Sequence, residues 1–292
     1  MSVVECRGLV KAFGRKQALK DLTFSLGENK ITGLIGRNGA GKTTLLKIMA
    51  GFFRETDGEI SVFSERPFNN LKVSANMIYI DDEMSFSPYL SLSEILEVMG
   101  SFYQDWDMDI AMRLFSYFGF DPDAHHSSMS KGMKSTFNMI VGLAARCPLT
   151  ILDEPTTGMD AAVRKDFYRA LLKDYIAYPR TIILSSHLLT EIEDLLEDVL
   201  LIKEGEKCLH LPLDELRHYA VGLTGNTERM NHAIPEEAIL FRKNVGMDST
   251  YAVVKNEGEK WMEGFHPTPV STEDVCMYLT SQSKGGIDDV FS

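Results

Sequence analysis

The sequence predicts an α/β fold with a mainly parallel core sheet, and two patterns carry this prediction. Short apolar runs rich in β-branched residues alternate with longer segments of helical periodicity, which is the order of elements that parallel sheets require. One apolar run leads into a glycine-rich stretch of the pattern G-x-x-x-x-G-K-[ST] at residues 36–43. That pattern needs a strand before it and a helix after it, and the flanking residues predict both.

The first part of the chain predicts strands that pair in antiparallel fashion. Residues 2–26 alternate between apolar and polar side chains and contain a turn near residues 14–16, as a hairpin does. Residues 59–63 repeat the alternation after a turn at residues 56–58. We therefore expect an antiparallel β subdomain beside the core sheet.

A glycine-rich loop lies between the buried strand expected at 31–35 and a helix expected at 44–50. Its glycines let the backbone fold tightly with N–H groups facing an anion, and the helix N-terminus adds partial positive charge. Lys42 can reach the β- and γ-phosphates of a nucleotide, and the Thr43 hydroxyl can ligate Mg²⁺. The alternative is a glycine turn that binds nothing. The predicted phosphate-binding residues are Gly36, Arg37, Asn38, Gly39, Ala40, Gly41, Lys42, Thr43 and Thr44.

Helical periodicity follows a short buried strand predicted at 77–80. Apolar residues recur on one face of each of two segments between Ser91 and Phe118. We interpret residues 84–140, approximately, as a helical insertion between strands of the core. His125 and His126 lack a third ligand at metal-binding spacing, so we expect them in a solvated loop.

Strands return in the second half of the core. The run at 149–152 ends in Asp153 and Glu154, which are placed to hold Mg²⁺ through water and to polarise an attacking water, respectively. The alternative is that these carboxylates only form a turn. A helix at 161–176 and a strand at 181–185 follow, the latter just before His187. The sequence then predicts a hairpin with strands at 199–203 and 207–209.

The chain after Pro212 predicts a small α+β appendage. Residues 238–241 and 251–254 resemble strands, and residues 271–274 resemble a capping box that opens a helix. We therefore divide the chain into a domain of residues 1–211 and an accessory domain of residues 212–292.

Composition narrows the class of protein. The 292-residue chain is 44% hydrophobic and 25% charged, as is ordinary for a soluble globular protein, and its net charge of −12 argues against nucleic acid as a partner. Its four cysteines are scattered singly, which favours a reducing cytosol. No apolar run is long enough to cross a bilayer, so a membrane process would need another chain.

The order of these motifs resembles the ATP-binding subunits of ABC transporters over residues 2–210. Residues 36–43 match the Walker A loop, and Asp153 and Glu154 end the Walker B strand. The resemblance implies further roles for residues outside these two motifs. These are Phe13 as the aromatic stacked on adenine, with a core Phe as the alternative; Ser130, Lys131, Gly132 and Met133 as the signature segment; Asp160 in the D-loop; and His187 as the switch histidine.

Two positions depart from the family pattern. The signature segment keeps only the serine and second glycine of Leu-Ser-Gly-Gly-Gln, as Ser130 and Gly132. Asp82 aligns with a glutamine of the family. A carboxylate can still ligate Mg²⁺, but it cannot donate a hydrogen bond to the attacking water as an amide can.

The resemblance implies an ATPase that uses ATP and Mg²⁺, with Lys42, Glu154 and His187 catalytic. Since each motif occurs once, a second subunit, identical or paralogous, must complete the site, and we expect an ATP-dependent dimer. Such a dimer powers a separate transmembrane permease from the inner face of the cell membrane. Residues 271–280 resemble the C-terminal helix of export-type subunits. The size of the chain, the signature variant and Asp82 in place of glutamine are similar to Ytr-like (GntR-operon-associated) proteins of Gram-positive bacteria. The alternatives are a soluble ABC-type switch and a weakly hydrolysing regulatory subunit.

Overall fold

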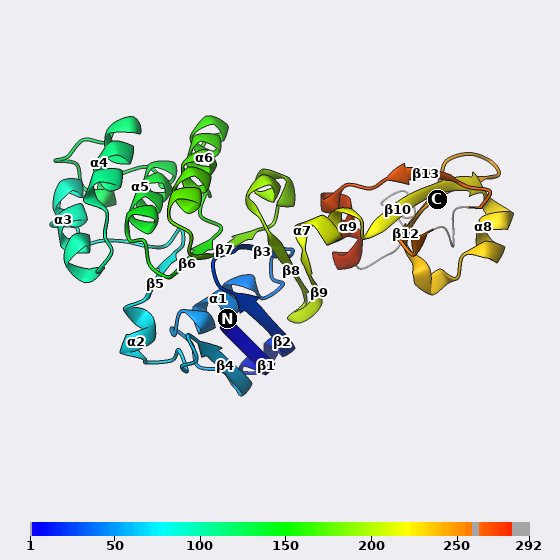
Figure 1. Cartoon of the computed structure of the whole chain (residues 1–292), viewed down its shortest axis with the longest axis horizontal. Helices are drawn as coiled ribbons and strands as arrows, with labels where there is room; N and C mark the ends of the chain where they lie inside the picture. The colour runs from blue at the N-terminus through cyan, green and yellow to red at the C-terminus, as the bar shows by residue number, and fades with distance from the viewer. Residues whose placement is uncertain (1, 259–262, 282–292) are drawn as a thin grey trace.

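The computed structural model describes residues 2–258 and 263–281, and a parallel sheet forms its centre (Figure 1). The strand order is β5-β6-β7-β3-β8-β9, with only β8 and β9 antiparallel within it. β3, β6 and β7 are buried throughout, as strands covered on both faces must be. The strand bounds are β3 (Ile31–Ile35), β5 (Met77–Ile80), β6 (Leu149–Asp153), β7 (Thr181–Ser186), β8 (Asp198–Lys203) and β9 (Glu206–Pro212).

The pairing register determines where the site lies. Ile35 pairs with Ser186, and Asp153 pairs with Ser185. Because these strands are parallel, the residues after β3, β6 and β7 emerge at one edge of the sheet. The predicted loop at 36–43, Glu154 and His187 are therefore neighbours in space.

The two faces of the sheet belong to two hydrophobic cores. Ile151 and Ile183 pack into one core with the N-terminal strands and α1 (Lys42–Met49). Leu152 and Leu184, one residue along, pack into the other core with Leu96, Phe115 and Phe137 of the helical insertion. Alternate side chains of a strand point to opposite faces, so each strand contributes to both cores.

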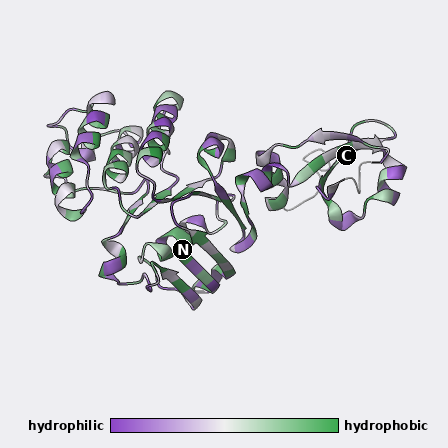
Figure 2. Ribbon diagram, in the orientation of Figure 1, coloured by the Kyte–Doolittle hydropathy of each residue, from purple (hydrophilic) through white to green (hydrophobic). Residues whose placement is uncertain are grey.

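An antiparallel sheet of order β2-β1-β4 covers the first of these faces. Its bounds are β1 (Ser2–Phe13), β2 (Lys16–Gly27) and β4 (Asp57–Val62). Bands of green and purple along these strands in Figure 2 show the alternation from which they were predicted. The prediction of an antiparallel β subdomain is confirmed, although β4 begins two residues earlier than expected, within the predicted turn.

Helices stand on the other side of the core sheet (Figure 1). The helical block predicted between Ser91 and Phe118 is divided, because residues 103–107 leave the helix and Asp107 caps a new one through the Ile110 N–H. Ser91 and Glu94 form a capping box at the first helix. The helices on this side are α3 (Leu92–Phe102), α4 (Met108–Tyr117), α5 (Lys131–Ala144) and α6 (Ala161–Ala177). The short helix α2 (Leu71–Ser74) instead packs Val73 into the first core.

The expectation of a solvated loop is wrong for His126. This side chain is 3% exposed, its Nε2 lies 2.9 Å from Asn138 Oδ1, and its ring packs against Phe86 and Phe137. Burial lowers the pKa of His126, whereas His125 remains exposed. His126 is thus a core residue of the helical insertion.

The C-terminal part contains a separate antiparallel sheet of order β11-β12-β10-β13. Sequence analysis identified β11, β12 and α9 but not β10, β13 or α8. Pro267 and Pro269 lie in β13, which is an edge strand and so tolerates proline. The bounds are β10 (Ala220–Asn226), β11 (Ile239–Asn244), β12 (Ser249–Lys255), β13 (His266–Pro269), α7 (Leu213–Arg217), α8 (Thr227–Ala233) and α9 (Thr272–Thr280).

Short 3₁₀ helices connect several elements, and one of them, η2, contacts α9. Although α9 is the last element that the structure describes, it packs on β8 and η2 as well as on β11. Val275 and Cys276 of α9 join the same core as Leu152 and Leu184. The predicted boundary at residue 212 stays a prediction. The 3₁₀ helices are η1 (His126–Ser128), η2 (Leu189–Glu191), η3 (Glu193–Leu195) and η4 (Glu236–Ala238).

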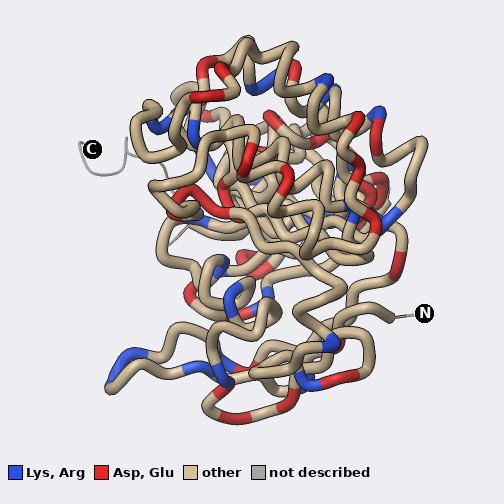
Figure 3. The backbone as a smooth tube through the Cα atoms, turned by 90° about the vertical axis from the view of Figure 1, so that its left-hand side faces the viewer, with Lys and Arg blue, Asp and Glu red and all other residues tan. Residues whose placement is uncertain are grey.

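Within residues 2–258 and 263–281, every helix is too short or too polar to span a bilayer. Acidic and basic residues are interspersed along the described chain (Figure 3).

Candidate functional site

The loop between β3 and α1 needs its glycines. Gly39 and Gly41 have φ values of +83° and +106°, which L side chains rarely adopt. A Cβ on Gly36 would lie 2.5 Å from Ile202 O. Helix α1 begins at Lys42 with no side-chain cap, so its first N–H groups are available to an anion.

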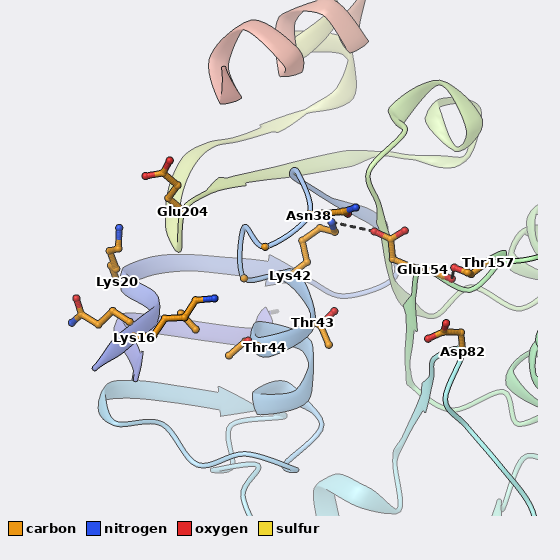
Figure 4. Close-up of a pocket in the computed structure, with 14 residues that line it drawn as sticks. Lys16, Lys20, Asn38, Lys42, Thr43, Thr44, Asp82, Glu154, Thr157 and Glu204 are labelled. Carbon is orange, nitrogen blue, oxygen red and sulfur yellow. Dashed lines mark hydrogen bonds and ion pairs between the residues drawn. The ribbon is translucent and has the colours of Figure 1, made fainter. Parts of the chain in front are cut away.

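Lys42 is buried beneath this loop. Its side chain is 6% exposed, and Nζ donates to Gly36 O at 2.7 Å. Nζ also lies 3.1 Å from Glu154 Oε1, and Figure 4 shows the two side chains pointing toward each other. The structure thus brings together the loop lysine and the carboxylate that follows β6.

Asp153 is held rigidly at the end of β6. Ser185 donates to Oδ1 at 2.6 Å and Tyr79 donates to Oδ2 at 3.0 Å, while the residue is 4% exposed. Burial, together with the Asp153 charge, raises the pKa of Tyr79, so its hydroxyl remains a donor. Both Asp153 oxygens are therefore already hydrogen-bonded.

Glu154 turns away from the strand toward the loop. Its φ of +48° is left-handed, and its N–H donates to Ser185 Oγ at 2.9 Å. Its second oxygen, Oε2, lies 2.7 Å from His187 Nδ1, and His187 is about half exposed. One carboxylate therefore joins Lys42 to His187.

Asp82 comes from the segment after β5 and lines the same cavity as Lys42. Its Oδ2 forms an ion pair with Lys131 Nζ at 2.7 Å. Lys131 is the first residue of α5, so this pair joins the edge of the cavity to the predicted signature segment.

The predicted signature segment lies outside this cavity. Ser130 caps α5 by accepting from the Met133 N–H at 3.3 Å. Gly132 packs directly on the loop before α6, where a Cβ would lie 2.4 Å from Gly158 O. A second cavity of about 250 Å³ is lined by Ser130, Gly132, Met133 and Asp160, and Asp160 also caps α6. One chain thus does not bring Ser130, Gly132 and Met133 into the cavity over the loop at 36–43.

The cavity over the loop has a volume of about 580 Å³ and receives residues that sequence reasoning missed. Lys16 and Lys20 reach it from β2, where a polar position on a strand carries no motif (Figure 4). Arg37 and Ala40 line a neighbouring cavity instead. The lining residues are Lys16, Gln17, Ala18, Lys20, Asn38, Gly39, Gly41, Lys42, Thr43, Thr44, Asp82, Glu154, Thr157 and Glu204.

Phe13 is not among the residues that line this cavity. It is 45% exposed at the end of β1, and its ring meets the edge of Phe53 at 5.5 Å between centroids. Lys11 Nζ lies 4.8 Å from the Phe13 ring centre. Phe13 is therefore neither a core residue nor part of the described cavity, and adenine stacking by it stays a prediction.

Comparison with known proteins agrees with this geometry. The family model described as ABC transporter matches residues 19–157. ABC transporter ATP-binding protein YtrB of Bacillus subtilis is 27% identical, covering 88% of this chain and 89% of YtrB. The uncharacterized ABC transporter ATP-binding protein YdbJ of the same organism is 31% identical, covering 70% of this chain and 67% of YdbJ.

A solved structure of the ATP-binding subunit of an ABC transporter is similar with a TM-score of 0.66. It is 25% identical and covers 74% of this chain and 92% of that chain. The predicted fold and the resemblance to Ytr-like proteins are confirmed. Because 88% of 292 residues is about 257, the similarity to YtrB extends past the predicted boundary at residue 211.

Proposed function

This chain belongs to the ABC transporter family of ATP-binding proteins, and we propose that it dimerises on ATP and powers a separate membrane permease, in export. The observation that carries the dimer is the separation of two half-sites. The loop at 36–43 and Glu154 share one cavity, whereas Ser130, Gly132 and Met133 line another. A second copy is needed to lay a signature segment over the first chain's nucleotide.

The chain is an ATPase, and the proposed roles follow from the contacts. Lys42 would exchange its contact with Glu154 for the β- and γ-phosphates, and the released carboxylate would polarise the attacking water. His187 would orient Glu154, since its Nδ1 already lies 2.7 Å from Oε2. Catalysis of this type depends mostly on positioning and charge neutralisation.

The donors around the cavity suit Mg²⁺. The Thr43 hydroxyl and the Asp82 carboxylate line the cavity, and Mg²⁺ prefers such oxygen ligands together with substrate phosphates and water. Asp153 has both oxygens hydrogen-bonded, so it would reach the ion through water. The ion would supply charge neutralisation at the phosphates.

A weakly hydrolysing regulatory subunit is the second candidate. The ion pair of Asp82 with Lys131 supports it, because a carboxylate in that position offers no donor to the attacking water. On either function, we place the chain in the cytoplasm, and under the transport proposal it is peripheral to the membrane through a permease. We assign residues 1–211 to the ATP-binding domain and the remainder to an accessory domain.

Two measurements test the proposal. Purified chain should hydrolyse ATP, and Lys42→Ala should abolish turnover, while Lys255→Ala, on the accessory sheet, should leave it unchanged. The tagged chain should also co-purify from detergent-solubilised membranes of its own host with one multi-spanning protein. Turnover without any membrane partner would favour a soluble switch, and binding without turnover would favour the regulatory subunit.

A further inference from the structure

Helix α9 contacts a residue of strand β8 that immediately precedes a residue of the nucleotide cavity. Lys203, the last residue of β8, donates from Nζ to Leu279 O at 3.5 Å and to Ser281 O at 2.5 Å, at the C-terminal end of α9. A lysine is favourable there because the last carbonyls of a helix lack helical partners and carry partial negative charge. The next residue, Glu204, lines the nucleotide cavity.

The turn after Lys203 is hydrogen-bonded to the phosphate-binding loop. The Gly205 N–H donates to Ala40 O at 2.9 Å, and Gly205 O accepts from the Lys20 N–H at 2.8 Å. A Cβ on Gly205 would lie 2.6 Å from Ala18 O, so the turn fits closely against β2. Lys203 is therefore connected to a carbonyl of the loop through the next two residues of the chain.

The loop and α9 also face each other directly. A cavity of about 290 Å³ is lined by residues 37–40 of the loop, residues 202–204 and Thr280. At the other end of α9, Thr272 Oγ1 donates to Glu193 at 2.6 Å. Helix α9 is thus fixed at both ends, and its C-terminal turn stands beside the loop.

We propose that Lys203 is a positioning residue that couples the docking of α9 to the affinity of the phosphate-binding loop for nucleotide. Through it, the accessory part sets the affinity of the loop for nucleotide. Coupling of two binding events is reciprocal, so nucleotide must in turn strengthen the docking of α9. The inference goes beyond transport and rests only on nucleotide binding by the cavity.

The first test is nucleotide affinity. Lys203→Ala should raise the Kd for Mg·ADP, measured by calorimetry, by about five- to tenfold, the lower range of typical coupling. Lys207→Ala is the matched control, because it removes a lysine of the same hairpin whose Nζ donates to Thr23 O. Its Kd should stay within about twofold of wild type, and Lys203→Arg should restore tight binding because it keeps the charge and the donors.

The second test follows the reciprocal effect, which a purely structural role would not produce. Mg·ADP should slow amide hydrogen exchange in residues 272–280 of the wild type and leave it unchanged in Lys203→Ala. An unchanged Kd in Lys203→Ala, with faster exchange in residues 272–280, overturns the inference. If Lys203→Ala fails to fold, Thr272→Val releases the other end of α9 and should weaken Mg·ADP binding by about fivefold, at the low end of such coupling.

An unchanged Kd in Thr272→Val, together with faster exchange in α9, would also overturn the proposal. A wild-type chain that binds no Mg·ADP would overturn nucleotide binding by the cavity itself, which separates that failure from the failure of Lys203 alone.

Discussion

Glu154 Oε1 lies 3.1 Å from Lys42 Nζ, and the same carboxylate contacts His187 through Oε2. The ion pair is largely buried on the lysine side, where Lys42 is only 6% exposed. Phosphate binding would replace this internal carboxylate as the partner of Lys42. The residue proposed to activate water would therefore be released by the substrate on which it acts.

Replacement of Glu154 separates binding from turnover. Glu154→Gln removes the negative charge that holds Lys42, so ATP should bind at least as tightly while turnover falls by about 10²–10⁴-fold, the usual contribution of a general base. With ATP present, sedimentation velocity should show a stable dimer. Glu237→Gln, an exposed carboxylate of η4, is the control. A Glu154→Gln chain that sediments only as a monomer with ATP would contradict the dimer.

Asp82 offers a direct test of the second candidate function. Asp82→Gln supplies an amide donor near the attacking water, so kcat should rise severalfold. The melting temperature should change little, since an ion pair as exposed as Asp82 with Lys131 contributes at most about 1 kcal/mol. Asp81→Asn serves as a control for the loss of a neighbouring charge. A tenfold fall in kcat for Asp82→Gln would instead mean that the carboxylate itself is required.

Gly132 cannot accept a side chain without movement of the loop before α6. Gly132→Ala places a Cβ 2.4 Å from Gly158 O, and overpacking of this kind costs about 1–3 kcal/mol. We expect a lower melting temperature and reduced ATP turnover, measured on the same preparation. Gly246→Ala is the control, because its Cβ would meet only Ser249 at an ordinary 3.5 Å. Equal melting temperatures for the two variants would refute the predicted clash.

His126 predicts how stability depends on pH. Its pKa in the folded chain is lowered from the ordinary 6.5, so the unfolded chain binds its proton first as pH falls. The stabilisation is present above pH 6.5 and is lost as pH falls toward the folded pKa. The melting temperature should therefore decline between pH 7 and pH 5.5, and less steeply in His126→Gln. His125→Gln, at the exposed neighbour, should keep the wild-type slope; equal slopes in all three chains would contradict the assignment.

The sequence predicted those parts of the site that depend on local chemistry. The loop at 36–43 carries its own glycines and lysine, and Asp153 and Glu154 follow an apolar run at 149–152, so both were located by residue number. Tyr79 and Ser185 were not, because their contacts with Asp153 depend on strand order across β5, β6 and β7. Lys16 and Lys20 were missed because a polar position on strand β2 carries no motif.

Prediction of the fold was also limited to features that local sequence determines. Buried strands of the core were identified by composition and the two helical segments by their periodicity, but residues 103–107 contain neither glycine nor proline to mark the bounds of the break between α3 and α4. β10 includes Gly222 and Gly225, which weaken any strand pattern. The core position of His126 is likewise determined by Asn138 and Phe137, which lie one helix later.

The place of α9 has a consequence for how this protein is made. Val275 and Cys276 pack into the same cluster as Ile35 of β3, although about 240 residues of chain separate them. A ribosome releases the first strands long before it delivers α9, and domains begin to fold as they emerge. Part of the interior of the nascent chain therefore stays uncovered until α9 has been synthesised.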